Sequence, residues 1–145
     1  MRIVDAPIII EQKYKISAAV VWTALTDIRQ MKRWYFENIP DFKPEVGFET
    51  QFEVRSGNRI FPHHWKVTKV VPLKKITYNW KYDGYPGNSF VTFELFPQDN
   101  QTLLRLTTKI EEDFPQDIPE FTRESCEAGW IYFIHNRLKK FLEKY

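Results

Sequence analysis

The stretch from Phe121 to Tyr145 constrains the fold of this chain more than any other. Acidic side chains gather at its start and basic ones at its end, the order that the dipole of a helix favours. Its middle, Ala128 to Ile134, is apolar on nearly every side, whereas a surface helix carries a single apolar stripe. We therefore expect one long helix that the rest of the chain encloses on most sides for about two turns.

The start of this helix has more than one candidate cap. Asp117 and Glu120 have the spacing of a capping box, and Thr122 or Ser125 would cap a slightly later start. Helical spacing also predicts one apolar face, with Phe133 beside it. That face consists of Trp130, Ile134, Leu138, Phe141 and Tyr145.

Gly129 is the anomaly in the helix, because a glycine inside a helix costs about 1 kcal/mol relative to alanine. One interpretation is that the helix backbone packs closely against a strand at this point. The other is that the missing side chain leaves room for a ligand. The sequence leaves both open.

The rest of the chain predicts one strand, then two short helices, and then a run of further strands. Pro7 to Ile16 alternates as a strand, Ala18 to Thr26 forms a helix after Ser17, and Asp27 opens a second helix with Ile28 and Met31 on one side. A period of two then predicts five further strands. These are Phe48 to Arg55, Ile60 to Val70, Lys75 to Tyr82, Phe90 to Phe96 and Thr102 to Ile110. Strands followed by a final helix predict an α+β fold with an antiparallel sheet, in a single domain over residues 1–145.

Several segments, in this order and spacing, resemble the helix-grip fold of the START-like, Bet v 1-like superfamily. Within it, the chain is most similar to the group named after the activator of Hsp-90 ATPase. The matching segments are Val21 to Asp27, Trp34, Asp41 to Pro44 before Gly47, Val70 to Pro72, Ile76 to Trp80, Val91 to Leu95, Gly129 with Trp130, and Leu138 to Leu142.

The resemblance implies a curved sheet of six strands, or seven, wrapped around the C-terminal helix with a cavity between them. It also implies binding or transport of small hydrophobic molecules, as in many members, or cyclase and related chemistry, as in some. In the Hsp-90 activator itself a separate N-terminal domain grips the chaperone. We expect no such second domain here, so the resemblance gives little support to a chaperone role.

Few side chains offer acid–base chemistry. His63 and His64 adjoin in a strand and so face opposite ways; His63 shares the parity of Phe61 and is expected inside, as a structural histidine or a base. A catalytic pair of His63 with Glu53 or Asp83 would have to be assembled by the tertiary fold. His135 is expected at the surface. We predict no catalytic residue, no metal site and no cofactor, because the spacings typical of such sites are absent.

Charge and cysteine usage narrow the class of protein further. The 21 basic and 19 acidic residues alternate closely and form no basic stripe, which argues against a nucleic-acid partner. We expect no signal peptide or membrane span. Its single cysteine, Cys126, fits a reducing compartment and is interpreted as a packing residue. We expect a cytoplasmic protein.

The 12 Phe, 7 Tyr and 5 Trp residues are many for this length, and they either fill the core or line a pocket. We predict a pocket for a lipid, sterol or aromatic polyketide-like ligand between the sheet and the last helix. Its predicted lining is Trp22, Met31, Tyr35, Trp65, Tyr78, Trp80, Phe93, Gly129, Trp130 and Phe133. Two alternatives stay open: a cyclase- or hydrolase-like enzyme, and a chaperone-associated protein that binds a protein partner.

Overall fold

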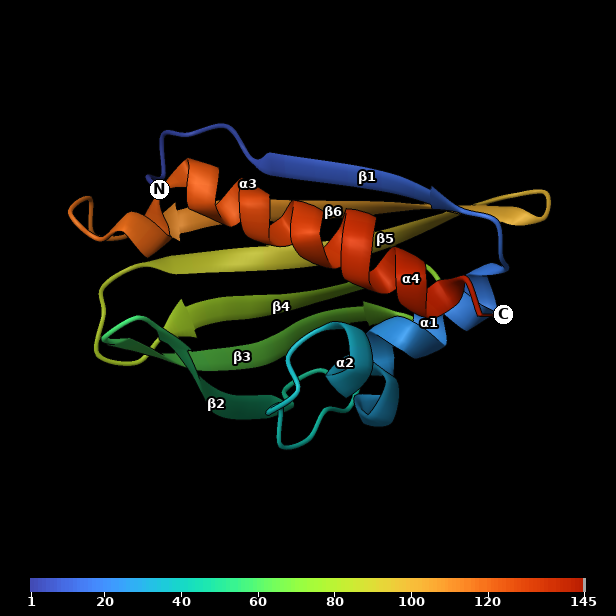
Figure 1. Cartoon of the computed structure of the whole chain (residues 1–145), viewed down its shortest axis with the longest axis horizontal. Coiled ribbons are helices and arrows are strands. Elements are labelled where there is room, and N and C mark those ends of the chain that lie inside the picture. Colours follow the sequence, from blue (N-terminus) through green and yellow to red (C-terminus); the bar gives the residue numbers. More distant parts are fainter. Residues whose placement is uncertain (145) are drawn as a thin grey trace.

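The computed structural model describes residues 1–144, so the prediction for Tyr145 lies outside the described residues. A single six-stranded sheet forms the body of the protein, with neighbours in the order β1-β6-β5-β4-β3-β2, all antiparallel (Figure 1). The strands are β1 (Ile8–Tyr14), β2 (Glu49–Ser56), β3 (Arg59–Val71), β4 (Lys75–Tyr82), β5 (Asn88–Gln98) and β6 (Gln101–Glu112). The α+β fold and the six strands predicted from the sequence are confirmed.

Two short helices, α1 (Ala18–Thr26) and α2 (Ile28–Trp34), connect β1 to β2. The C-terminal segment consists of a 3-10 turn η1 (Pro119–Phe121), then α3 (Arg123–Ile131), a π-helical stretch η2 (Tyr132–Arg137) and α4 (Leu138–Leu142). The last three elements form one continuous helical run that crosses a face of the sheet, with α1 and α2 near its C-terminal end (Figure 1).

Thr122 fixes where this long helix begins. Its hydroxyl accepts a hydrogen bond from the backbone N–H of Ser125 at 3.2 Å, which satisfies one of the amides that have no partner within the first turn. The helix therefore starts at Arg123, two positions later than the predicted Phe121. Of the candidate caps, Thr122 is the one that forms.

The helix is not enclosed on most sides, and that prediction was wrong. Ile131 and Tyr132 are 42% and 49% exposed, whereas Trp130, Ile134 and Leu138 are buried. The sheet lies against only one side of the helix (Figure 1), so the helix has one buried face and the other apolar side chains meet solvent.

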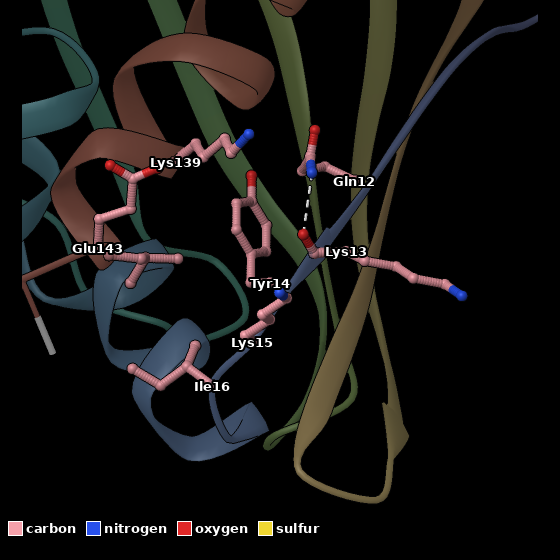
Figure 2. Close-up of a pocket in the computed structure, with 8 residues that line it drawn as sticks. Gln12, Lys13, Tyr14, Lys15, Ile16, Lys139 and Glu143 are labelled. Carbon is pink, nitrogen blue, oxygen red and sulfur yellow. Dashed lines mark hydrogen bonds between the residues drawn. The ribbon is translucent and has the colours of Figure 1, made fainter.

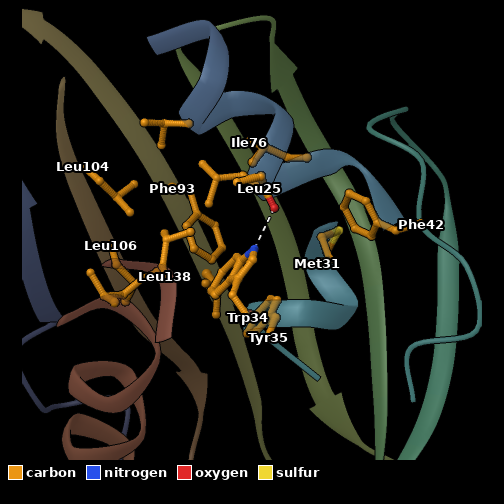
Figure 3. Packing of buried hydrophobic residues seen from close by; sticks show 14 of the residues in the cluster. Leu25, Met31, Trp34, Tyr35, Phe42, Ile76, Phe93, Leu104, Leu106 and Leu138 are labelled. Atoms are coloured by element: carbon orange, nitrogen blue, oxygen red, sulfur yellow. Dashed lines mark hydrogen bonds between the residues drawn. The ribbon is translucent and has the colours of Figure 1, made fainter. Parts of the chain in front are cut away.

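The main core fills the space between the sheet and the helices α1, α2 and α4. Figure 3 shows Trp34 and Tyr35 of the α2 region packed among leucines of β6 and α4, with the Trp34 indole donating to the carbonyl of Ala24 at 2.7 Å. Leu104 and Leu138 are fully buried there. Burying one such side chain stabilises the fold by about 1.5–3 kcal/mol.

Within residues 1–144, no helix combines the length and the apolar character that a membrane crossing requires.

Candidate ligand-binding site

A cavity of about 270 Å³ lies beside the N-terminal half of the long helix, where it faces β2, β3 and β4. Helix α3 and turn η1 contribute one wall and the strands contribute the opposite one. The apolar lining consists of Phe36, Val54, Phe61, Trp80, Phe121, Trp130 and Phe133, together with the backbone of Gly129. The cavity is therefore built mainly from aromatic rings.

Gly129 has no packing reason to be glycine. No described atom beyond the glycine's own neighbourhood lies within 4 Å of the point where a Cβ would stand. The interpretation that the helix backbone packs closely against a strand is therefore wrong. The missing side chain instead leaves space at the cavity wall.

The structure brings four of the ten predicted pocket residues to this cavity: Trp80, Gly129, Trp130 and Phe133. The rings of Trp80 and Trp130 meet edge to face with centroids 5.5 Å apart. This is the arrangement that aromatic pairs favour, and it joins the sheet to the helix at one side of the cavity.

The other six predicted residues do not line this cavity. Trp22 is half-buried at the edge of the main core, and the remaining five are buried within it: Met31, Tyr35, Trp65, Tyr78 and Phe93. Tyr35 stacks on Trp34 with ring centroids 4.5 Å apart, and its hydroxyl lies 2.9 Å from that of Tyr78. Strand parity identified the inward faces correctly, but it does not distinguish a filled interior from a hollow one.

His63 is a buried polar side chain in the cavity wall, and the prediction that it faces inward is confirmed. Its Nδ1 lies 2.9 Å from the carbonyl oxygen of Phe61. Because a carbonyl can only accept, Nδ1 carries the proton and Nε2 is left as an acceptor in the neutral ring. Burial lowers the pKa of His63 to about 4, so the imidazole is neutral at pH 7.

Trp80 presents a buried indole N–H that has no hydrogen-bond partner among the described residues. Burial raises the pKa of the neighbouring Tyr82 phenol, and the Trp80 indole N–H, which lies near this phenol without meeting hydrogen-bond geometry, opposes the rise only in part. Burial likewise raises the pKa of the Cys126 thiol to about 12, which makes a reactive thiolate unavailable at pH 7. The inner wall is therefore uncharged.

Charged groups are confined to the mouth of the cavity. Ser56 donates to a carboxylate oxygen of Glu120 at 2.8 Å, and Arg59 approaches the other oxygen at 3.3 Å. The hydrogen bond from Ser56 is the main reason that the pKa of Glu120 lies below its usual value. The N-terminal amine of Met1 donates to the carbonyl of Phe121 at 2.8 Å. The contacts of Ser56 and Arg59 hold turn η1 against the β2–β3 hairpin, and that of Met1 joins the turn to the start of the chain.

Comparison with known proteins shows the family. Residues 15–143 match the family described as "Activator of Hsp90 ATPase homolog 1-like protein". The chain belongs to this family. No curated protein sequence is similar enough to match it.

Solved structures share the fold of this Hsp90-activator-like chain. A protein of Chromobacterium violaceum is 20% identical with a TM-score of 0.78, over 94% of this chain and 96% of that one. The Aha1 dimer from Colwellia psychrerythraea is 24% identical with a TM-score of 0.69, over 96% and 97%. A protein in the dynemicin biosynthetic locus is 22% identical with a TM-score of 0.75, over 96% of this chain and 48% of that one.

The acid–base pair considered from the sequence does not form in this family member. Asp83 lies 3.4 Å from Nδ1 of His64, on the opposite face of β3 from His63, and Glu49 lies 2.9 Å from the other nitrogen of His64. Glu53 is exposed. Within residues 1–144, no group of three metal-ligating side chains comes together.

His135 lies at the surface, as predicted, and its Nε2 contacts the carbonyl of Glu11 at 2.9 Å.

Sequence reasoning missed part of the lining. Phe61 and Tyr82 were predictable, since Phe61 shares the inward face of β3 with His63 and Tyr82 shares that of β4 with Trp80. Phe36 and Phe121, by contrast, come from a loop and a 3-10 turn. Such segments have no periodic pattern that would predict which way a side chain faces.

A second hollow, of about 490 Å³, lies between β1 and α4 (Figure 2). Long charged side chains surround it, including those of Lys15, Lys139 and Glu143. The hydroxyl of Tyr14 donates to the carbonyl of Ile134 at 2.7 Å and is thus already paired. We interpret this hollow as a solvent-exposed groove, because four of its eight lining residues are charged, whereas small-molecule sites have mainly apolar walls.

Proposed function

We propose that this chain binds a small apolar or amphipathic molecule in the cavity beside Gly129, and that it does so as a binding protein. The observation that carries the proposal is the glycine itself. It costs the helix about 1 kcal/mol relative to alanine, yet no described neighbour occupies the space that it leaves. Because this loss of helix stability brings no packing benefit, it supports a requirement for open space beside Gly129.

The chemistry of the walls supports the same conclusion. Aromatic rings form most of the surface, and a few polar residues, among them Ser56, His63 and Tyr82, interrupt it. Small-molecule sites have this composition: apolar walls with a small number of placed polar groups. The Cys126 thiol, unpaired within the described chain, supports a reducing location such as the cytoplasm as part of the proposal.

A pair of matched helix variants tests the proposal. Gly129→Leu places a side chain into the cavity, whereas Ala128→Leu adds the same side chain one position earlier, where the helix is exposed. The probes are palmitate, cholesterol and naphthalene derivatives, and the readout is the change in amide and indole N–H resonances on titration.

We expect at least one probe to shift resonances of Trp80, Gly129 and Phe133 in the wild type and in Ala128→Leu, and to lose affinity in Gly129→Leu. The proposal fails if no probe shifts these resonances. It also fails if Gly129→Leu binds as tightly as Ala128→Leu.

A further inference from the structure

The geometry points to the charge of the occupant: we infer that the ligand is an elongated amphiphile whose anionic headgroup pairs with Arg137 while its apolar body extends along the helix to Gly129. This inference rests on the proposed function and deepens it, because it names the chemical class of molecule that the cavity would take. The headgroup has the chemistry that carboxylates and phosphates share, a compact negative charge that accepts several hydrogen bonds.

The cavity beside Gly129 has a larger neighbour. A hollow of about 720 Å³ adjoins it, and Phe36, Val54 and Phe133 border both. The two hollows together form a groove between the long helix and β2, which is an edge strand of the sheet. Arg137 lines the far end of this groove, roughly 12 Å along the helix from Gly129 at about 1.5 Å per residue. The groove therefore has room for an extended molecule with one apolar and one charged end.

The π-helical stretch η2 builds the charged end. Tyr132, Phe133 and Arg137 belong to it, and all three line the larger hollow. On an α-helix, side chains three or four residues apart are neighbours, but the i→i+5 bonding of a π-helix brings residues five apart onto one side. Nη1 of Arg137 accordingly donates to the Tyr132 hydroxyl at 3.2 Å, and its guanidinium lies 5.9 Å from the centre of that ring.

A further contact fixes the guanidinium at the groove. Nη2 of Arg137 donates to the carbonyl of Arg33, in α2, at 2.6 Å. Arg137 is half-buried, yet no carboxylate of residues 1–144 forms an ion pair with it. A guanidinium has more N–H donors than these contacts use. The remaining donors are held in position for an anion, the group that the planar fork of arginine matches.

The other charged residues that border this hollow leave Arg137 without a counter-charge. Glu53 and Arg55 flank Val54 in β2; since Val54 lines the groove, its two neighbours share the opposite face of the strand. Glu37 is exposed and forms no ion pair with Arg137. An anionic headgroup would therefore supply the partner that a partly buried charge requires, whereas a cationic one would be repelled.

Four ligands with the same decyl chain test the inference by titration calorimetry at pH 7. Decanoate and decyl phosphate are anionic, decanol is neutral and decylammonium is cationic. We expect at least one of the two anions to bind about tenfold more tightly than decanol, as a charge-assisted hydrogen bond of ~1.4 kcal/mol requires. We expect decylammonium to bind most weakly. The tighter of the two anions identifies the headgroup as a carboxylate or a phosphate.

Variants of Arg137 assign the headgroup contact. Arg137→Gln should abolish the preference for the anions and leave the affinity for decanol unchanged, because it removes the charge and keeps the apolar walls. Arg137→Lys should retain only part of the preference, since lysine carries the charge without the planar fork. Lys140→Gln is the matched control: it removes an equal charge one turn later, at an exposed position outside the groove, and should leave the preference intact.

A measurement on the wild type keeps the test valid should a variant fail to fold. Decanoate with an isotope-labelled carboxyl carbon is titrated with acid, and the resonance of that carbon reports the pKa of the bound headgroup. Pairing with Arg137 should lower this pKa below that of free decanoate, because a nearby positive charge favours the carboxylate. A pKa equal to or above that of free decanoate would contradict the inference.

The outcomes separate this inference from the proposed function. Equal affinities for decanoate, decyl phosphate and decanol, with binding lost in Gly129→Leu, would overturn the inference and leave the proposed function standing. An anion preference that survives in Arg137→Gln would do the same. Failure of every ligand, charged or neutral, including those named under the proposed function, would overturn both.

Discussion

The interior of this protein has two halves that contain the same kinds of residue, but one half is packed and the other borders a cavity. Near α2, the rings of Trp34, Tyr35 and Trp65 stack in a buried core. Near α3, Trp80 and Trp130 border an open cavity. Aromatic side chains of β3 and β4 face both halves, so residue type does not decide which half is hollow.

The elements that lie over the sheet decide it. The α2 end places Tyr35 against the strands, and its hydroxyl pairs with Tyr78 at 2.9 Å. Helix α3 instead presents Gly129, which places nothing there. The indole N–H groups of Trp65 and Trp80 are both buried without a hydrogen-bond partner among the described residues, although the Trp80 ring borders the cavity. The residues that the helices place over the sheet therefore determine which half is hollow.

The largest expected effect comes from deleting a ring in the packed half. Phe93→Ala should lower the free energy of unfolding by about 3–5 kcal/mol, because Phe93 is 2% exposed and its removal leaves a cavity. Phe133→Ala should cost less than half as much, because Phe133 is only half-buried and already borders open space. Urea denaturation measures both, and equal losses would remove the distinction between the halves.

Lowering the pH should destabilise the protein through His63, which lies in the wall of the hollow half. His63 has a folded pKa of about 4 against an ordinary value of 6.5, so the unfolded chain takes up a proton first as the pH falls. Stability should drop between pH 6.5 and 4 by about 3 kcal/mol from this residue alone, and its contribution should be constant below that window.

Denaturation of His63→Phe across the same pH range isolates this contribution, since the carboxylates titrate alike in both proteins. The difference in stability between wild type and variant should change with pH between 6.5 and 4. Parallel pH profiles would show that His63 is not held neutral by burial.

The hydroxyl pair of the packed half should behave as a unit. Tyr35→Phe should cost about 1–3 kcal/mol, because it leaves the buried Tyr78 hydroxyl without its partner. The double variant with Tyr78→Phe should cost less than the two single losses combined. A double-mutant cycle by urea denaturation checks this, and strict additivity would argue against the hydrogen bond.

The smallest expected effect is a gain. Gly129→Ala should raise the free energy of unfolding by up to about 1 kcal/mol, because the helix favours alanine and nothing described obstructs the methyl group. Gly87→Ala is the contrasting control: its φ is +115° and a Cβ there would overlap the ring of Phe114, so it should destabilise. Thermal denaturation of the two variants should move in opposite directions.

Much of the fold could be predicted from the sequence because strands and helices leave periodic patterns. The predicted Lys75 to Tyr82 strand is β4 to the residue, and the alternation in β3 placed His63 inside. The position of the cavity could not be predicted in this way. It depends on where Phe36 and Phe121 fall, and both belong to segments without a repeating pattern.

Apolar composition likewise overstated how enclosed the helix is. Ile131 and Tyr132 belong to the apolar run but face solvent, because a single sheet covers only one side of a helix. Gly129 was recognised as anomalous, and the choice between its two explanations needed atoms on the opposite wall. The tertiary contacts around Gly129 decided between the two explanations, and no local sequence pattern encodes such contacts.

The most direct test of this account is the binding of xenon, which enters apolar cavities whatever their natural ligand. Crystals of the wild type and of Gly129→Leu, with Ala128→Leu as the control, would be pressurised with xenon and their electron density compared. The account predicts a xenon site between Gly129, Trp80 and Phe133 in the wild type and in Ala128→Leu, and none there in Gly129→Leu. Xenon among Tyr35, Trp65 and Phe93, with none beside Gly129, would contradict it.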